Sequence, residues 1–349
     1  MTDVAREAGV SVATVSNVLN QPHRVAEPTR SRVTAVIQRL GYVRSENARL
    51  LRGVPSRVLA VLVPDLANPF YAALVRGAED EARKAGLAVL VGNSVHDPRE
   101  ENRYLDLFTE HQIRGVLLTP SGPDGAGIRA LQRSTVPFVL VDQAAPSRDL
   151  CSVSVDDAVG GRLAMEHLIR MGHRSIAYVS GPGRLPQVRE RRAGALQALS
   201  AAPQPIEFHE LPCDHLTLAT GRDAGSRLLG MRKRPTAVLC ANDLLALGVF
   251  QTLHTAGLHV PQDMALAGYD DIELAAAAAV PLTSVRRPAV TMGSLAARLL
   301  IAETQRDGTP EHAHRQIVIE PELAVRQSTL HPPRQPPPGP PKKAAPPPP

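Results

Sequence analysis

Apolar residues near the start of the chain recur at the spacing of α-helices. The segment 2–42 divides into three such stretches, separated by Gly9 and by Asn20-Gln21-Pro22. Ser11 has the side chain of a helix cap at the start of the second stretch, and Pro28 suits the first turn of the third. The pattern predicts helix, tight turn, helix, and then a third helix. They enclose one small core formed by Val4, Ala5, Ala8, Val15, Val18, Leu19, Val33, Val36, Ile37 and Leu40.

After Arg57 the pattern changes, because short continuous apolar runs alternate with stretches of helical length. This alternation is typical of parallel strands joined by crossover helices. A first series has strands at 58–63, 87–92, 115–118 and 138–141, and helices at 69–85, 98–111 and 124–134. A second series has strands at 175–181, 206–211, 237–242 and 264–271, and helices near 157–171, 187–200, 217–230 and 243–257.

The two series predict an α/β core of two doubly wound parallel-sheet lobes, with a ligand site at the carboxyl ends of the strands. A helix at 290–305 and short strands near 317–325 complete the lobes, so the chain crosses between them more than once. The expected units are a small all-α helix-turn-helix headpiece in 1–44, a linker in 45–57 and the core in 58–330. We expect the first lobe at about 58–152 and 287–316, and the second at about 153–286 and 317–330.

The net charge is confined to the headpiece and linker. Residues 1–57 hold nine arginines and four acidic residues, a formal charge of +5, which is the charge of the entire chain. Sequence-independent attraction to DNA needs basic groups gathered on one surface. The distribution favours a nucleic-acid-binding module on a neutral ligand-binding body, with a solvated basic face as the alternative.

Cysteine usage and hydropathy indicate a protein of the reducing cytoplasm. Cys151, Cys213 and Cys240 are widely spaced and odd in number, which argues against a disulfide framework or a CxxC metal site. No apolar run has the length of a bilayer-spanning helix, and no signal-peptide pattern precedes the first helix. The proline-rich tail at 331–349 is expected to be disordered.

The motifs that would indicate an enzyme or a metal site are missing. Asp156-Asp157 and Asp270-Asp271 are adjacent carboxylates whose side chains usually point apart, and the glycines of 181–183 form no complete phosphate-binding motif. His312 and His314 lie in a polar loop without a third ligand. We expect no catalysis, no cofactor and no metal ion.

Several stretches together resemble one family in order and spacing. They are DVAREAGVSVATVSNVLNQPHRV, TRSRVTAVIQRLGY, VLVPDLANPFYAALVRGAEDEA, GVLLTP, VDDAVGGRLAMEHLIRMGHRSIAYVSG, RRAGAL, PTAVLCANDLLALG, GYDDIELA and PLTSVRRP. They resemble LacI/GalR-type transcriptional regulators over about residues 2–330. The resemblance implies a repressor with a helix-turn-helix headpiece and a core like the type I periplasmic binding proteins.

In such a headpiece the second helix lies in the major groove. The resemblance places Val12, Ala13 and Asn17 at base edges, where the apolar residues suit a thymine methyl and Asn17 suits adenine. The alternative for Asn17 is a phosphate contact, and many family members carry Arg there. Phosphate contacts are expected from Ser11, Thr14, Ser16 and Arg24.

Residues 45–53 resemble the family's hinge helix, which orders on operator DNA. Leu51 matches an apolar wedge in the minor groove, and Ala48 permits close approach. Arg49 and Arg52 are expected to contact phosphates. The alternative is an amphipathic linker with Leu50 and Leu51 packed on the core.

For the effector, the resemblance places a set of polar and aromatic residues at the cleft between the lobes. They suit a sugar or sugar derivative, with a nucleoside or purine as the second possibility. His215 stands where relatives carry Phe or Trp. The expected site residues are Asn68, Phe70, Tyr71, Arg191, His215, Asn242 and Asp270.

The expected function is therefore repression through a pseudopalindromic operator bound by a homodimer, with a tetramer also compatible. A small molecule in the cleft would alter the lobe angle and the hinge. The rival hypothesis is a sugar-binding protein, cytoplasmic or exported, without a role at DNA. The basic headpiece and the missing signal-peptide pattern disfavour it.

Overall fold

The computed structural model describes residues 1–42, 55–122, 125–305 and 313–330. The chain divides into two compact units, Met1–Ser56 and Arg57–Pro349. The expected hinge contacts Ala48, Arg49, Leu51 and Arg52 lie outside the described residues, as do His312 and the tail. In the described part of the chain, no helix combines the length and the apolar character needed to cross a membrane.

The headpiece consists of α1 (Thr2–Ala8), α2 (Val12–Asn20), a short 3-10 helix (Pro22–Arg24) and α3 (Glu27–Arg39). Gly9 ends α1 with a left-handed φ of 62°, and the Ser11 hydroxyl caps α2 by accepting a hydrogen bond from the Thr14 amide at 3.0 Å. Both features agree with the predicted helix-turn-helix.

The headpiece core agrees with the prediction except at Leu40. The apolar stripes of the three helices bury the predicted valines and alanines. Leu40 is 42% exposed because it follows the last residue of α3, where the chain turns away at Gly41 (φ 58°). Tyr42 packs against the core after this turn.

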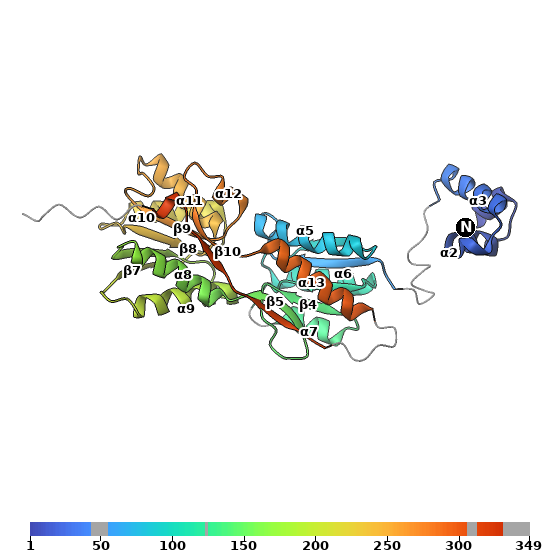
Figure 1. The fold of residues 1–349 in the computed structure, drawn as a ribbon, viewed down its shortest axis with the longest axis horizontal. Helices are drawn as coiled ribbons and strands as arrows, with labels where there is room; N and C mark the ends of the chain where they lie inside the picture. Colours follow the sequence, from blue (N-terminus) through green and yellow to red (C-terminus); the bar gives the residue numbers. More distant parts are fainter. Residues whose placement is uncertain (43–54, 123–124, 306–312, 331–349) are drawn as a thin grey trace, which may run out of the picture. The chain divides into compact units, whose positions relative to one another are not determined.

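The first sheet of the core has the strand order β11-β5-β4-β3-β1-β2, and all of its strands are parallel. Figure 1 shows α5 and α13 together on one side of it. The strands are β1 (Val58–Val63), β2 (Ala88–Asn93), β3 (Gly115–Leu118), β4 (Phe138–Val141), β5 (Cys151–Val155) and β11 (Gln316–Ile319). The helices are α5 (Pro69–Lys84), α6 (Pro98–Glu110), α7 (Ala126–Arg133) and α13 (Ala289–Thr304).

Strand β1 shows why the sheet is covered on both faces. Leu59 and Val61 belong to the apolar cluster that includes α5 and α13, whereas Ala60 and Leu62 belong to the cluster that includes α6 and α7. Successive side chains of a strand point to opposite faces, so a continuously apolar strand needs helices on both sides. This is the doubly wound arrangement expected from the sequence.

The second sheet has the order β12-β10-β9-β8-β6-β7, and only its edge strand β12 is antiparallel to its neighbour. Its strands are β6 (Ser175–Val179), β7 (Glu207–Leu211), β8 (Ala237–Cys240), β9 (Ala265–Asp270), β10 (Thr283–Arg286) and β12 (Glu322–Ala324). Its helices are α8 (Asp157–Arg170), α9 (Pro186–Ser200), α10 (Leu218–Leu229), α11 (Asp243–Thr255) and α12 (Glu273–Ala276), and a 3-10 helix follows at Gln327–Thr329.

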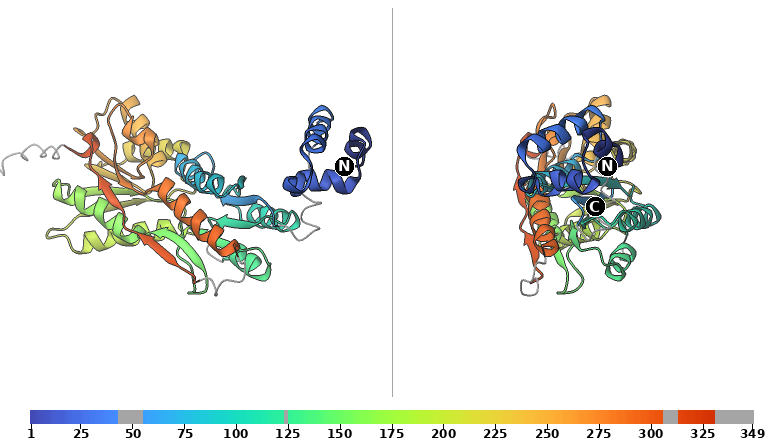
Figure 2. Two further views of the ribbon diagram at one scale, coloured as in Figure 1. Left: turned by 45° about the vertical axis from the view of Figure 1, so that its right-hand side comes forward. Right: turned by 90° about the vertical axis from the view of Figure 1, so that its right-hand side faces the viewer.

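The lobe boundaries differ from the expected ones by a few residues. Strands β5 and β11 lie wholly in the first sheet, so the chain crosses near residue 156 and again near residues 320–321 (Figure 2). A further crossing joins β10 to α13 at 287–288. β5 and β10 have no counterpart among the predicted strands, because CSVSV and TSVR lack the continuous apolar run used to find the others.

Candidate functional site

The exposed face of helix α2 carries the residues expected to contact DNA bases. Val12 is 45% exposed although it is apolar, and Ala13 and Asn17 are exposed as well. The opposite face packs Val15 and Val18 into the headpiece core. The core therefore fixes which face of α2 is presented to the outside, and that face carries the expected base contacts.

The hydroxyls expected at phosphates already make hydrogen bonds within the headpiece. The Ser11 and Thr14 hydroxyls lie 2.9 Å apart, and the Asn20 amide donates to the Ser16 hydroxyl at 3.1 Å. Arg24 is exposed in the 3-10 helix. Hydroxyls both donate and accept, so these bonds orient the side chains without using all of their capacity.

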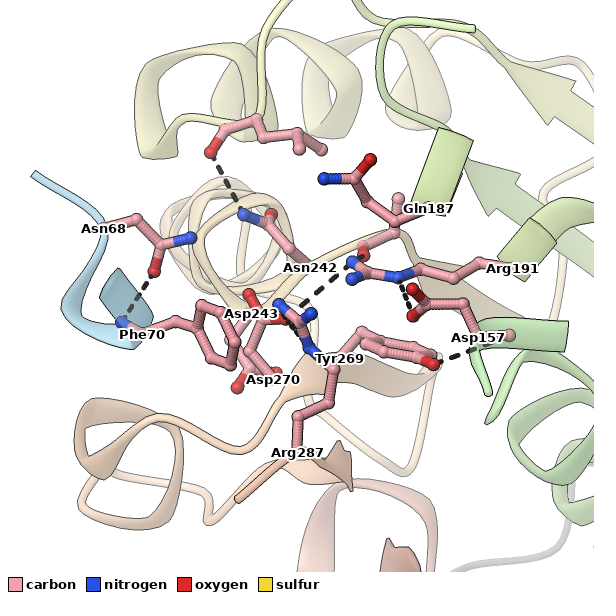
Figure 3. A network of polar contacts seen from close by, with 12 residues as sticks. Asn68, Phe70, Asp157, Gln187, Arg191, Asn242, Asp243, Tyr269, Asp270 and Arg287 are labelled. Atoms are coloured by element: carbon pink, nitrogen blue, oxygen red, sulfur yellow. Dashed lines mark hydrogen bonds and ion pairs between the residues drawn. The ribbon is translucent and has the colours of Figure 1, made fainter. Parts of the chain in front are cut away.

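A buried network of charges lies between the lobes of the core, centred on Arg287 (Figure 3). Its guanidinium donates to Asp142, which follows β4 in the first lobe, and its Nη2 lies 2.8 Å from Asp270 Oδ1, at the end of β9 in the second. The same guanidinium is centred 3.6 Å from the Phe70 ring. Arg287 stands on the crossing between β10 and α13, so it joins both lobes.

A second arginine, Arg191, is held from within the second lobe. Its Nε donates to Asp157 Oδ1 at 2.8 Å, its Nη1 donates to the Ala241 carbonyl at 2.7 Å, and its guanidinium lies 3.9 Å from the Tyr269 ring. Gly161 of α8 faces the backbone of Arg191 so closely that a Cβ would overlap its carbonyl. Glycine at this position therefore lets α8 and α9 approach enough for Arg191 to reach Asp157.

Asp142 connects the network to further residues of both lobes. Its Oδ2 accepts from the Tyr71 hydroxyl at 3.1 Å, and the Gln187 amide of α9 lies 3.5 Å from the same oxygen. Asp142 has a φ of 65° and Asp270 a φ of 107°, in the region that favours glycine. Non-glycine residues held there store strain and cluster at functional sites.

Burial and charge pairing act against each other at these groups. Burial raises the pKa of the Asp142 carboxyl, and Arg287 opposes that shift. Burial alone would lower the pKa of Arg287, but Asp142 and Asp270 raise it above the ordinary value. The arginines therefore stay charged and hold the carboxylates in place. Burial also raises the pKa of Tyr71, so its hydroxyl stays protonated and donates to Asp142.

Polar side chains from both lobes surround a cavity of about 10 Å³, which is the space of a single water molecule. The lining residues are Asp65, Asn68, Tyr71, His96, Gln187, Arg191, Leu216, Asp270 and Arg287. Burial lowers the pKa of His96. A cavity of this size holds no metabolite, whereas an open groove of about 590 Å³ beside it is also lined by Phe70, Asp270 and Arg287.

Comparison with known proteins gives the family. The model described as "Bacterial regulatory proteins, lacI family" matches residues 1–45, and the "Periplasmic binding protein-like domain" matches residues 165–329. The HTH-type transcriptional regulator DegA of Bacillus subtilis (strain 168) is 33% identical over 330 residues, which are 94% of this chain and 97% of DegA. This chain belongs to the lacI family.

Solved structures agree with this family. The complex of the transcriptional regulator CelR with cellobiose matches with a TM-score of 0.69 at 31% identity, over 93% of this chain and 98% of CelR. The lac repressor dimer bound to operator and the anti-inducer ONPF matches with a TM-score of 0.79 at 28% identity, over 94% and 98%. The chain is thus a DNA-binding transcriptional regulator, which overturns the rival binding protein without a role at DNA.

Four residues of this LacI-family regulator that were expected at the effector come together at the cavity: Asn68, Tyr71, Arg191 and Asp270. Phe70 lies beneath Arg287 instead. Asn242 caps α11 and donates to the Leu216 carbonyl at 3.1 Å, so it positions a lining residue rather than lining the cavity itself.

His215 is exposed, and its neighbour Leu216 lines the cavity. The Asn68 side chain oxygen accepts from the Phe70 amide as the cap of α5, which leaves the nitrogen to face the cleft (Figure 3).

Several cavity and network residues are missing from the predicted site, among them Asp142, Gln187 and Arg287. Asp142 follows β4 directly, at the carboxyl end of a parallel strand, where ligand sites of such sheets lie. Arg287 follows β10, which the sequence pattern does not reveal. Gln187 begins α9 one turn before Arg191, so the two residues share a helix face. Position at a strand end was the available signal for Asp142.

Proposed function

We propose that this regulator binds an uncharged, polyhydroxyl effector, a sugar or sugar derivative, in the cleft between its lobes. Occupancy of the cleft would control the affinity of the headpiece for its operator. The observation that carries the effector class is the pairing of charges: Arg191 and Arg287 lie against Asp142, Asp157 and Asp270, all of them buried.

This pairing disfavours a phosphorylated or carboxylated effector. A buried anion needs an uncompensated positive group, and both arginines already face carboxylates at 2.8 Å or less. Hydroxyl groups donate and accept, so they suit a surface on which carboxylates, amides and guanidinium groups alternate. CelR, which was solved with cellobiose, is a relative that binds such a molecule.

A sugar also suits the cleft better than a purine or nucleoside. Bases in proteins commonly stack on aromatic rings, and one face of Phe70 is covered by Arg287 at 3.6 Å. Tyr269 is covered by Arg191 at 3.9 Å in the same way. Ring faces covered by a guanidinium group in this way are not free for a base to stack on. The cavity is therefore lined mainly by polar side chains, which suit the hydroxyl groups of a sugar.

Effector binding within the small cavity would require the lobes to separate, because that cavity has room for only about one water molecule. The bonds of Asp142 to Arg287 and Gln187 join the two lobes and would be exchanged for bonds to the effector. A ligand shifts this equilibrium only through different affinities for the two lobe arrangements. The network thus supplies contacts that differ between the free and bound states.

Calorimetric titration with uncharged monosaccharides and disaccharides, their phosphate esters and a set of nucleosides tests the effector class. We expect one uncharged sugar to bind and its phosphate ester to bind at least about tenfold weaker, a difference of about 1.4 kcal/mol. Asp270→Asn should abolish effector binding and leave operator binding intact. Asp106→Asn, which alters an exposed carboxylate that lines neither the cavity nor the adjoining groove, should bind as wild type. Binding of nucleosides alone would contradict the sugar proposal.

For DNA, we infer that Val12, Ala13 and Asn17 contact bases and that Ser11, Thr14, Ser16 and Arg24 contact phosphates. The exposed face of α2 and the exposed Arg24 support this assignment. Arg49 and Arg52 as phosphate contacts and Ala48 and Leu51 in the minor groove remain predictions from the sequence. Leu51→Ala should weaken specific operator binding far more than non-specific binding, and equal losses on both DNAs would contradict the wedge.

We further propose that the regulator acts as a homodimer, since one helical turn separates the half-sites that two headpieces read. The related lac repressor was solved as a dimer on its operator. Sedimentation of the protein with and without DNA tests this, and a monomer that binds a half-site as tightly as the full site would exclude it.

A further inference from the structure

Three potential metal ligands converge in the first lobe, away from the network described above. Among the described residues, Cys151, Glu303 and His314 offer a sulfur, a carboxylate oxygen and an imidazole nitrogen that all lie within 4.8 Å of one another. Cys151 begins β5, Glu303 lies in the last turn of α13, and His314 precedes β11. The sequence gives His314 no third ligand, but the fold brings two residues to it that are 163 and 11 positions away.

The separations suit a tetrahedral ion. The Cys151 Sγ and the His314 Nδ1 are 3.7 Å apart. Bonds of about 2.3 Å to sulfur and about 2.0 Å to nitrogen, at a tetrahedral angle, place these two atoms about 3.5 Å apart. The Glu303 carboxylate oxygen lies within 4.8 Å of both atoms, so it has to move closer to them to complete the set. His314 is at least partly exposed, so an ion can enter from its side.

Two carboxylates near this point favour a cation, against the charge of Arg315, which also acts on Cys151. Glu303 is 8% exposed and lies at the C-terminal end of α13, where the helix dipole is negative, and the last turn of α13 has no basic residue. A carboxylate there is electrostatically unfavourable, and a bound cation reverses the sign of the interaction. The exposed carboxylate of Asp149 also lies near His314 and adds to the negative potential.

Cys151 has the environment of a structural thiolate ligand. It is completely buried, and the Arg315 amide donates to its sulfur at 3.4 Å. A metal ion displaces the thiol proton to solvent as the metal–sulfur bond forms. An amide donating to the sulfur then stabilises the thiolate from outside the ligand set.

We propose that Cys151, Glu303 and His314 bind a borderline-soft divalent ion of the Zn²⁺ class, with water as the fourth ligand. A thiolate and an imidazole select such ions over Mg²⁺ and Ca²⁺, which prefer oxygen. The ion ties the start of β5, the end of α13 and the residues before β11 together, and so stabilises the first lobe.

Co²⁺ is the probe, because a thiolate bound to it gives a charge-transfer band. Untagged full-length protein, freed of metal and kept reduced with a phosphine, is titrated with Co²⁺ and then with Zn²⁺. We expect one Co²⁺ per chain, a thiolate band, and displacement by Zn²⁺. Cys151→Ser should lose the band, and Cys213→Ser, the matched buried cysteine outside the cluster, should keep it.

His314→Gln tests the site without altering a buried side chain. It should weaken Co²⁺ binding at least about 100-fold, because loss of even a residue outside the ligand set typically costs 10- to 100-fold. Zn²⁺ should raise the melting temperature of the wild type and of Cys213→Ser but not of His314→Gln. A wild-type protein without the thiolate band, a band that persists in Cys151→Ser, or His314→Gln that binds as wild type would overturn the proposal and leave only the contact between Cys151 and His314.

Discussion

The headpiece and the cleft use polar residues in opposite ways. On helix α2, the proposed base contacts Val12, Ala13 and Asn17 are exposed, and the core residues behind them supply the stability. In the cleft, Arg191, Arg287 and the carboxylates that they bind are almost completely buried. The headpiece thus separates the residues that stabilise the fold from those proposed to bind DNA, whereas in the cleft the same side chains stabilise the core and are proposed to bind the effector.

This difference has an energetic consequence. Removing an exposed contact residue deprives the ligand of an interaction and leaves the domain folded. Removing one member of a buried charge network leaves its partners charged and without compensation in a low-dielectric interior. Substitutions at α2 should therefore change DNA binding alone, and substitutions in the cleft should change stability together with effector binding.

The largest expected effect comes from Arg287→Ala. It deprives Asp142 and Asp270 of their shared partner, so we expect the unfolding free energy of the core to fall by about 3–5 kcal/mol. Arg286→Ala is the matched control, because Arg286 is half exposed and pairs with Asp271 at 2.7 Å. Its loss should cost about 0–1 kcal/mol. Urea unfolding followed by far-UV circular dichroism measures both, since the chain has no tryptophan.

Equal losses of unfolding free energy in Arg287→Ala and Arg286→Ala would contradict the contrast between headpiece and cleft, because they would mean that burial of the charge network does not affect stability. A large loss in Arg287→Ala alone would support the contrast. Effector binding by Arg287→Ala, measured where the variant is still folded, then separates its binding role from its role in stability.

A second effect concerns a buried histidine of the core. His173 is 1% exposed, its Nδ1 lies 2.9 Å from the Thr236 hydroxyl, and burial lowers its pKa to about 4. The unfolded chain binds a proton near pH 6.5, so the folded state is favoured above that pH and loses stability as the pH falls toward 4. The loss is about 1.4 kcal/mol per pH unit, or about 2 kcal/mol at pH 5.

Unfolding free energies of wild type and His173→Gln at pH 7 and pH 5 check this value. The wild type should lose about 2 kcal/mol more than the variant over this interval. Parallel pH dependences would show that His173 is protonated in the folded core.

The sequence predicts the local features of both regions well and the convergence of distant residues poorly. The alternation of apolar runs and helical stretches predicts the two lobes, because a run of apolar residues indicates that this segment itself is buried. Arg191 and Asp270 were expected at the cleft from the family resemblance, and both line its cavity. Asp142 and Arg287 meet only because β4 and the crossing after β10 come together in space. Periodicity carries no information on such pairs that are 145 residues apart.

The proposed metal site illustrates the same limit. His314 looks isolated in the sequence, since its neighbours in the fold come from strand β5 and helix α13. Strand β5 was itself missed, because its serines interrupt the apolar pattern while the backbone is buried between β4 and β11. Headpiece residues, by contrast, lie in short helices whose contacts are local in sequence, and only Leu40 was placed incorrectly.

On the headpiece side, Asn17→Ala should alter sequence preference and nothing else. If Asn17 pairs with a base, selection from random DNA with the variant should lose the preference at one position of each half-site, worth about 1–3 kcal/mol. Effector affinity and core stability should match those of the wild type. Uniform weakening on every sequence would instead assign Asn17 to the phosphate backbone.

The smallest effect tests whether the separation of tasks holds at Ser11, which both caps α2 and is proposed to contact phosphate. Ser11→Ala should lower headpiece stability by about 1 kcal/mol, whereas Ser11→Gly, which caps a helix nearly as well, should lower it by only a few tenths. Both variants lack the hydroxyl. Equal losses of DNA affinity in the two would therefore establish a phosphate contact that is independent of capping, and losses that follow the stability difference would show that Ser11 acts on DNA only by starting the helix.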